Sequence, residues 1–310
     1  MALLDVRTEP PAQARARPAA PRAVRWREAV AGYAFTAPAL AVFGAFMFLP
    51  LALTFMISFQ EYSGFGRAEW IGARNYTDIV ADSTFWRALA NTVVLGIFLV
   101  PISLFGGLGL AMLLNRAMPA RTLLRALFYV PVVISGVSAG LIAKWMFNET
   151  LGVVNRVAEA VGLPGPAWQS SGVPAMASVI VVTVWTTIGY NMVVYLAALQ
   201  GVPGEMHEAT RVDGANWWQQ VRLITWPMLR PTTFFLVVWG IIGSFQVFDL
   251  VYVMTGGGPG NATTLLVTYA YSEGFAQRRQ GYAAAIGVVL YVIVMVLTVV
   301  QFRLNRRREA

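Results

Sequence analysis

The chain has 310 residues, of which 57% are hydrophobic and 12% are charged, a balance that excludes an ordinary soluble globular domain and indicates a polytopic membrane protein. The absence of cysteine excludes disulfides and thiolate chemistry, and the single histidine, His207, supplies at most one ligand, so no metal site is expected. The net charge of +8 comes from basic residues gathered at the chain ends and in short loops, which favours the positive-inside bias of membrane proteins over nucleic-acid binding.

Residues 1–31 are rich in Ala, Pro and Arg, a composition typical of a disordered tail. A targeting peptide is the alternative. However, the first apolar run begins late and is long enough to cross a bilayer. We therefore expect the tail to be cytoplasmic and the run to be retained as a membrane helix.

Apolar runs long enough to span a bilayer, which takes about 20 residues each, follow the tail. Six are expected, at Tyr33–Phe59, Thr92–Leu114, Leu124–Phe147, Ala175–Leu199, Thr232–Met254 and Tyr282–Phe302. The predicted fold is therefore an all-α membrane protein with six transmembrane helices over residues 32–303 and a short basic C-terminus at 304–310.

The distribution of basic residues predicts the orientation. One side of the membrane would carry sixteen of them: Arg7, Arg15, Arg17, Arg22, Arg25, Arg27, Arg116, Arg121, Arg125, Arg211, Arg222, Arg230, Arg303, Arg306, Arg307 and Arg308. The other side would carry seven: Arg67, Arg74, Arg87, Lys144, Arg156, Arg278 and Arg279. Because the basic side of a membrane protein faces the cytoplasm, both termini are expected there.

The outer loops contain ordered features. The segment 60–91 mixes aromatic and polar residues, which indicates a short interfacial helix and a landing surface for an external partner, with an aromatic belt as the alternative. The segment 148–174 is expected to form an ordered cap. Gly256, Gly257 and Gly258 are interpreted as a turn that returns the chain to the membrane, in preference to a phosphate-binding loop.

A polar segment, residues 200–231, separates the fourth and fifth runs. Pro203 and Gly204 open a first short helix, which Asp213-Gly214 closes. Asn216, with Gln219 three residues later, predicts the N-cap of a second helix, close to a capping box. We expect Pro227 and Pro231 to end this helix and start the fifth span. We call this helix-turn-helix the elbow.

The elbow closely resembles the EAA loop of ABC-importer permeases. The family order of Glu-Ala-Ala, three residues, Gly, nine residues, Ile, one residue and Leu-Pro is matched in every spacing. The matching positions are Glu208-Ala209-Thr210, Gly214, Ile224 and Trp226-Pro227. Thr210 replaces the second Ala and Trp226 replaces Leu, which bears on the fine fit to a partner. An ordinary amphipathic linker is the alternative.

Other segments resemble the carbohydrate and glycerol-phosphate branch of these permeases, and specifically the maltose-type first subunit. They are Tyr129-Val130-Pro131, Asn148–Asn155, Ala209 with Asp213-Gly214-Ala215, Thr255–Pro259 and Gly281-Tyr282. The resemblance implies a permease subunit of the bacterial inner membrane that imports a sugar, polyol or glycerol-phosphate solute. It also implies a heterodimer with a second permease, an ATPase dimer, an external solute-binding protein, and coupling through Glu208, Ala209, Asp213, Gly214, Ala215, Ile224 and Pro227.

Catalytic motifs are missing from the sequence. A phosphate-binding loop requires Gly-x-x-x-x-Gly-Lys-Ser/Thr, and the one lysine, Lys144, lies between Ala143 and Trp145. His207-Glu208 begins like a zinc-protease motif, but Arg211 occupies the position of the second histidine. We therefore expect a non-catalytic subunit that binds no cofactor, with ATP and magnesium bound by partner ATPase chains.

Polar residues inside the expected spans point to a solute path, because each is costly unless it is paired or faces water. The candidates are Trp185, Tyr190 and Asn191 in the fourth span and Gln246 and Asp249 in the fifth. Amides, carboxylates and aromatic faces suit a sugar. Hydrogen bonding between helices is the alternative for this set.

Two other functional classes compete with the importer. An ion-coupled secondary transporter would need membrane carboxylates, of which Asp249 is the one candidate, and the sequence shows no inverted repeat. A structural membrane subunit would not need the spacing of the elbow. Gly136 and Gly140 form a Gly-x-x-x-Gly pair, which predicts close helix packing and not a ligand.

Overall fold

The computed structural model describes residues 22–309. They fall into two compact units, one up to Leu53 and one from Thr54. Residues 1–21 of the expected tail lie outside the described residues, and the first helix begins at Arg22, inside the range expected to be disordered.

The first unit is helical throughout its described part. It contains α1 (Arg22–Phe43), the π-helical turn η1 (Gly44–Phe48) and most of α2 (Leu49–Ile57), which continues past the boundary of the unit. Pro38 lies inside α1. The side chains described here are largely exposed and apolar, as expected for a helix whose surroundings are lipid.

The second unit holds a small hairpin and the remaining helices. In chain order these are β1 (Gln60–Glu61), β2 (Glu69–Trp70), α3 (Arg74–Ala81), α4 (Ser83–Asn115), α5 (Arg121–Val133), α6 (Gly136–Met146), α7 (Val153–Ala160), α8 (Gly172–Gln200), α9 (Gly204–Val212), α10 (Trp217–Gln220), η2 (Val221–Thr225), α11 (Trp226–Met228), α12 (Arg230–Ser244), α13 (Asp249–Met254), α14 (Leu266–Tyr271), η3 (Ser272–Ala276) and α15 (Gln280–Glu309). β1 and β2 pair antiparallel.

The all-α membrane fold is confirmed, although the expected spans take three different forms. Within residues 22–309, four helices are long and apolar enough to cross a bilayer, at Val30–Ile57, Ser83–Asn115, Gly172–Gln200 and Gln280–Asn305. The third expected span is a pair, α5 and α6, bent by 99°. The fifth is broken into α12, of 15 residues, and α13. α12 alone is shorter than the roughly 20 residues that a perpendicular span needs.

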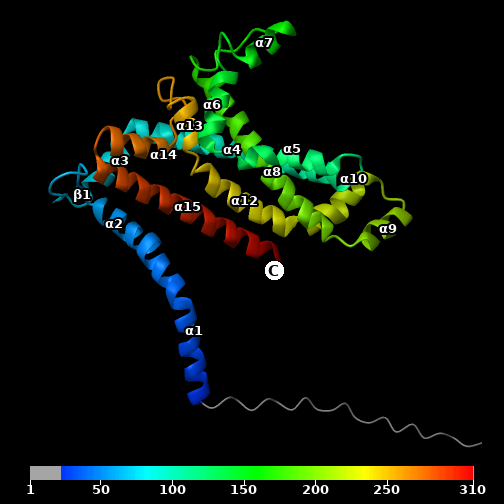
Figure 1. The fold of residues 1–310 in the computed structure, drawn as a ribbon, viewed down its shortest axis with the longest axis horizontal. Coiled ribbons are helices and arrows are strands. Elements are labelled where there is room, and N and C mark those ends of the chain that lie inside the picture. The colour runs from blue at the N-terminus through cyan, green and yellow to red at the C-terminus, as the bar shows by residue number, and fades with distance from the viewer. Residues whose placement is uncertain (1–21, 310) are drawn as a thin grey trace, which may run out of the picture. The chain divides into compact units, whose positions relative to one another are not determined.

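The helix α4 organises the core of the second unit. Its N-terminal end (Phe85, Ala88) packs with α14 and α15, its middle (Leu95, Leu99) with α6, α8 and α13, and its C-terminal end with α8, α12 and the elbow. Lipid is as apolar as leucine, so close van der Waals packing, and not burial from water, holds these helices together. The elbow and the β1–α3 region lie at opposite ends of this unit (Figure 1).

The Gly-x-x-x-Gly pair lies at a close helix contact, as predicted. α6 packs on α13, and a Cβ added at Gly140 would lie 3.1 Å from the carbonyl oxygen of Leu250. A Cβ at Gly136 would lie 2.9 Å from a carboxylate oxygen of Asp249. The two glycines therefore let the broken fifth span approach the bent third span.

Candidate functional site

The first helix of the elbow has the expected bounds. α9 runs from Gly204 to Val212, with Glu205 in its first turn and Arg211 in its last, an arrangement that suits the helix dipole. Glu208 and Ala209 are exposed on this helix. Its charged residues are therefore available to a partner.

A left-handed glycine turn closes α9. Gly214 has φ +79°, a conformation that a residue with a Cβ adopts at a cost. The amide of Ala215 donates to the carbonyl of Thr210 (2.9 Å), and the amide of Asp213 donates to that of Ala209 (3.0 Å). These bonds satisfy the last carbonyls of α9 and set the direction in which the chain leaves it.

The second helix starts with the predicted cap. The Asn216 side chain accepts from the amide of Gln219 (2.9 Å), and the Gln219 side chain accepts from the amide of Asn216 (2.7 Å). This is a complete capping box. It orients the helix that leads back to the membrane domain.

The prediction that Pro227 ends this helix is wrong. α10, η2 and α11 follow one another, and Pro227 lies within α11. Because η2 is a π-helical turn, the backbone amide of Trp226 donates to the carbonyl of Val221, five residues back. The widened turn accommodates a residue that has no amide to donate, so the chain continues through Pro227 toward α12.

The elbow has an exposed end and an embedded end. Glu208, Ala209, Asp213 and Gly214 are exposed, and Ala215 is half-buried. Ile224 is 5% exposed, and Pro227 is half-buried. The coupling residues implied by the family resemblance thus separate into those that a partner can touch and those that pack within this chain.

The residues where the elbow departs from the family order pack internally. Trp226 is half-buried and stacks on Phe105 of α4, with ring centroids 6.4 Å apart. The hydroxyl of Thr210 donates to the carbonyl of Met206 (3.1 Å).

A cavity of about 440 Å³ lies between the end of α4 and the elbow, where the Arg116 guanidinium lies 5.8 Å from the Trp217 ring centroid. The elbow therefore contacts α4 through large side chains.

The predicted path residues of α8 occupy different environments. Asn191 is 4% exposed and faces α4, since a Cβ added at Gly107 would lie 2.7 Å from the Asn191 Cβ. Trp185 is 41% exposed and lines an apolar cavity of about 570 Å³ with Val181 and Phe147. The structure does not bring Trp185 and Asn191 to one cavity.

Tyr190 belongs to an aromatic row that sequence reasoning missed. Its ring stacks on Trp239 of α12 (centroids 5.9 Å apart), which in turn stacks on Phe235 (6.3 Å). Trp239 is 52% exposed. The spacing of Phe235 and Trp239, four residues apart on one helix face, was the available signal. The row joins α8 to α12.

Gln246 and Asp249 lie at the break in the fifth span. Gln246 is in the non-helical link 245–248, and Asp249 begins α13. Both residues are exposed. Broken spans place polar backbone and side chains at a membrane protein's interior or at a water-filled cavity. The break explains why these two polar residues fall within an otherwise apolar run.

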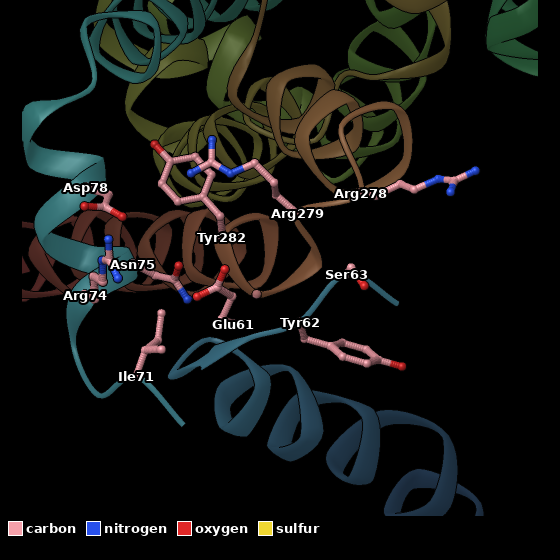
Figure 2. Close-up of a pocket in the computed structure, with 11 residues that line it drawn as sticks. Glu61, Tyr62, Ser63, Ile71, Arg74, Asn75, Asp78, Arg278, Arg279 and Tyr282 are labelled. Atoms are coloured by element: carbon pink, nitrogen blue, oxygen red, sulfur yellow. The ribbon is translucent and has the colours of Figure 1, made fainter. Parts of the chain in front are cut away.

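The outer loops form a polar cavity of about 270 Å³ at the hairpin end (Figure 2). Its charged lining residues are Glu61, Arg74, Asp78, Arg278 and Arg279. The Arg279 guanidinium lies 4.3 Å from the Tyr282 ring centroid, and Arg278 points away from the cavity (Figure 2). A short helix, α3, is present in this segment as expected, and the side-chain amide of Asn75 ties it to the carbonyls of Ser58 (2.9 Å) and Gln60 (3.0 Å).

A carboxylate at the start of α4 holds three outer elements together, which the sequence did not suggest. Asp82 caps α4 by accepting from the amide of Thr84 (2.8 Å), and its other oxygen accepts from the hydroxyls of Tyr269 and Tyr282. Burial opposes ionisation of Asp82, but these hydrogen bonds outweigh it and hold the pKa of its carboxyl below the usual value. Burial and the bond to Asp82 raise the pKa of Tyr269.

The expected outer cap at 148–174 is ordered by two side chains. One Glu149 oxygen accepts from the amides of Gln169 (2.8 Å) and Ser170 (2.7 Å), bonds that lower the pKa of this carboxyl. The Trp168 indole donates to the Asn155 side chain (2.7 Å). The loop is therefore closed onto α7 by polar contacts.

Comparisons with known proteins agree on one family. The model of the binding-protein-dependent transport system inner membrane component matches residues 103–310. The lactose transport system permease protein LacF of Rhizobium radiobacter is 35% identical over 90% of this chain and 95% of its own length. The sulfoquinovosyl glycerol transport system permease protein SmoG of Agrobacterium fabrum is 34% identical over 93% of this chain and 96% of its own length.

Solved structures support the fold. A chain of a bacterial alginate ABC transporter, crystallised with an alginate pentasaccharide-bound periplasmic protein, superposes with a TM-score of 0.81. It covers 92% of this chain and 96% of that chain at 24% identity. At this identity the likeness concerns the fold alone.

Proposed function

Because the chain belongs to the family of binding-protein-dependent transport system inner membrane components, we propose that it is a permease subunit of an ATP-driven importer of a sugar or related polyol. The sugar class is supported by relatives named as lactose and sulfoquinovosyl glycerol transport permeases. Its partners would be a second permease, an ATPase dimer and an external solute-binding protein. ATP and magnesium would bind to the ATPase chains.

The observation that carries this proposal is the two-ended elbow. Its exposed end presents Glu208, Ala209 and Asp213 to a partner, while its embedded end passes through buried Ile224 and α11 to α12 with a single turn residue, buried Leu229, between them. A push on the exposed end therefore moves α12 and, through Trp226 on Phe105, α4. This is the geometry required to convert closure of an ATPase into rocking of the spans.

The orientation follows from this role. The elbow and both termini would face the cytoplasm, where the ATPase resides, in agreement with the excess of basic residues on that side. The hairpin and α3, whose residues line the polar cavity, lie at the opposite end of the second unit from the elbow (Figure 1). We assign this cavity and α3 as the landing surface for the external binding protein.

The solute path would run between α8 and α12–α13. Alternating access needs elements that move, and the bent pair α5–α6 and the link 245–248 are the interruptions in the spans. Gln246 and Asp249 would bond a passing solute from the link, and Tyr190, stacked on Trp239, would offer a ring face. Asn191 would act where α8 meets α4.

Cross-linking tests the proposed ATPase contact. The chain lacks cysteine, so Glu208→Cys introduces one reactive thiol on the exposed end. We expect it to cross-link to the ATPase of the same transport system in a nucleotide-dependent way. Ala117→Cys, exposed in the link between α4 and α5 and outside the elbow, is the matched control.

Reconstitution distinguishes the importer from an ion-coupled transporter. Proteoliposomes containing both permeases and the ATPase should accumulate sugar when ATP and the binding protein are present. Uptake driven by an ion gradient without the ATPase, or no nucleotide-dependent cross-link from position 208, would contradict the proposal.

A further inference from the structure

A row of four aromatic rings begins at the link that breaks the fifth span and continues over α13, α14 and η3. Phe248 stacks on Tyr252 (centroids 5.3 Å apart), both contact Tyr271 (5.0 and 5.2 Å), and Tyr271 stacks on Phe275 (4.9 Å). The rings come from α13, α14 and η3 and the link before α13. Tyr252 is 49% exposed and Phe275 67% exposed, so ring faces remain free for a ligand.

The row borders a cavity with polar walls. Tyr252 and Tyr271 line a space of about 340 Å³ together with Asn261, Ser272 and Glu273. Among the described residues, neither tyrosine hydroxyl has a hydrogen-bond partner, whereas the neighbouring Tyr269 hydroxyl is bonded to Asp82. Aromatic walls with a few unpaired polar groups are typical of a small-molecule site.

The glycine-rich turn that lines part of the cavity is held in place by hydrogen bonds. The Asn91 side chain donates to the carbonyls of Asn261 (2.9 Å) and Thr264 (3.0 Å), which ties the glycine-rich turn to α4. The hydroxyls of Thr255 and Thr263 bond each other (2.8 Å). A wall fixed in this way loses little freedom when a ligand binds.

The chemistry of this site suits a neutral sugar. A pyranose ring has one apolar face that stacks on aromatic rings, and hydroxyls that bond to phenols and amides. The described lining residues include one carboxylate, Glu273, paired with Arg279 at 3.0 Å, and no basic side chain. Because Arg279 already pairs with Glu273 and the described lining residues include no basic side chain, the charge of an anionic sugar would have no partner there.

We propose that the aromatic row and its cavity form an outer sugar-binding site, which takes a neutral sugar ring before it enters the path between α8 and α12–α13. The proposal rests on the sugar-import function proposed above. It adds a separate site, built from Tyr252 and Tyr271, and a preference for uncharged sugars.

Variants of the two tyrosines test the site in the complete transporter. Tyr252→Leu and Tyr271→Leu keep apolar volume but remove the ring face, and Tyr252→Phe and Tyr271→Phe retain it. Phe98→Leu, at an exposed aromatic residue of α4 that does not line the cavity, is the control. Uptake of radiolabelled lactose and maltose by proteoliposomes gives KM and maximal rate.

We expect the Leu variants to raise KM about five- to tenfold, the effect of losing one aromatic stacking contact, with unchanged basal ATPase activity. The Phe variants keep the ring and lose one hydroxyl hydrogen bond, so we expect a smaller rise in KM of about two- to fourfold, and Phe98→Leu should remain within about twofold of wild type. Unchanged KM in both Leu variants, while wild type imports the sugar, would overturn the site. Competition by glucuronate as strong as that by glucose would overturn the preference for neutral sugars.

A direct binding measurement separates this site from the proposed function. Saturation-transfer NMR with lactose and maltose on the solubilised transporter reports ring contacts without transport. If wild type imports neither sugar but binds one through a signal lost in the Tyr252→Leu/Tyr271→Leu double variant, the import proposal fails and the site stands. Absence of binding to wild type overturns the site.

Discussion

At the scale of single residues, Gly214 determines where the elbow turns. Its φ of +79° and its open surroundings, with no atom within 4 Å of an added Cβ, show that backbone conformation and not space demands glycine here. In this left-handed region a residue with a Cβ is less favourable than glycine by about 1–2 kcal/mol. A substitution at Gly214 therefore destabilises the turn of the elbow and leaves the spans unaffected.

Gly214→Ala should therefore insert and assemble normally while losing most of the solute-stimulated ATP hydrolysis of the complex. Stimulated hydrolysis at constant permease level is the measurement. Gly204→Ala is the control, because Gly204 has equally open surroundings without the left-handed conformation. Equal stimulation in wild type and Gly214→Ala would show that the turn does not carry coupling.

The ionised Asp82 carboxylate predicts that the stability of the protein depends on pH. Its folded pKa is lowered below its unfolded value of about 3.9. The stabilisation is therefore fully present above about pH 4 and is lost as pH falls through the folded pKa. Asp82→Asn should lower the thermal unfolding temperature at pH 7, and this difference from wild type should shrink as the pH is lowered toward 3.

Asp78→Asn is the matched control for this measurement, since Asp78 is an exposed carboxylate of the neighbouring helix α3. Its unfolding temperature should follow that of wild type at every pH. A constant difference between Asp82→Asn and wild type from pH 7 to pH 3 would contradict the role assigned to the ionised carboxylate.

At the scale of elements, breaks in helices distinguish the predicted path from the packed core. α4 and α8 are continuous, and their contact buries Asn191. The link before α13 leaves Gln246 and Asp249 exposed. A polar group bonded to solute at such a link affects transport, whereas a polar group at a helix contact affects assembly as well.

Gln246→Ala should reduce sugar uptake or change which sugar is accepted, with normal membrane levels and basal ATPase activity. Loss of one hydrogen bond to solute corresponds to about 0.5–1.5 kcal/mol, roughly two- to tenfold in KM. Asn191→Ala should lower uptake in the same way if it faces the path. A fall in protein abundance with all activities would instead assign Asn191 to packing.

At the scale of the whole molecule, the orientation is a direct test of the assembly. With no native cysteine, Ser63→Cys in the outer loop and Ala310→Cys at the C-terminus each report one side. A membrane-impermeant maleimide should label Ser63→Cys in intact spheroplasts and Ala310→Cys after permeabilisation. The opposite pattern would place the elbow on the wrong side for an ATPase.

The sequence by itself determined the class of protein, the family and the local form of the elbow. These depend on composition and on short-range spacing, so the capping box at Asn216 and the glycine end of α9 were predictable from neighbouring residues. The close contact at Gly136 and Gly140 was predictable for the same reason, although its partner helix, α13, was not.

Only the tertiary structure decided which polar residues meet. The bonds of Asp82 to Tyr269 and Tyr282 join residues almost 200 positions apart, and the ring contact of Tyr190 with Trp239 joins two spans. Apolar runs also do not reveal breaks. The pair α5–α6 is apolar enough to cross a bilayer as a straight helix would, so hydropathy does not show its 99° bend. Pro131 in the last turn of α5 and Ser135-Gly136 at the break permit the bend, and packing against the neighbouring helices sets its direction.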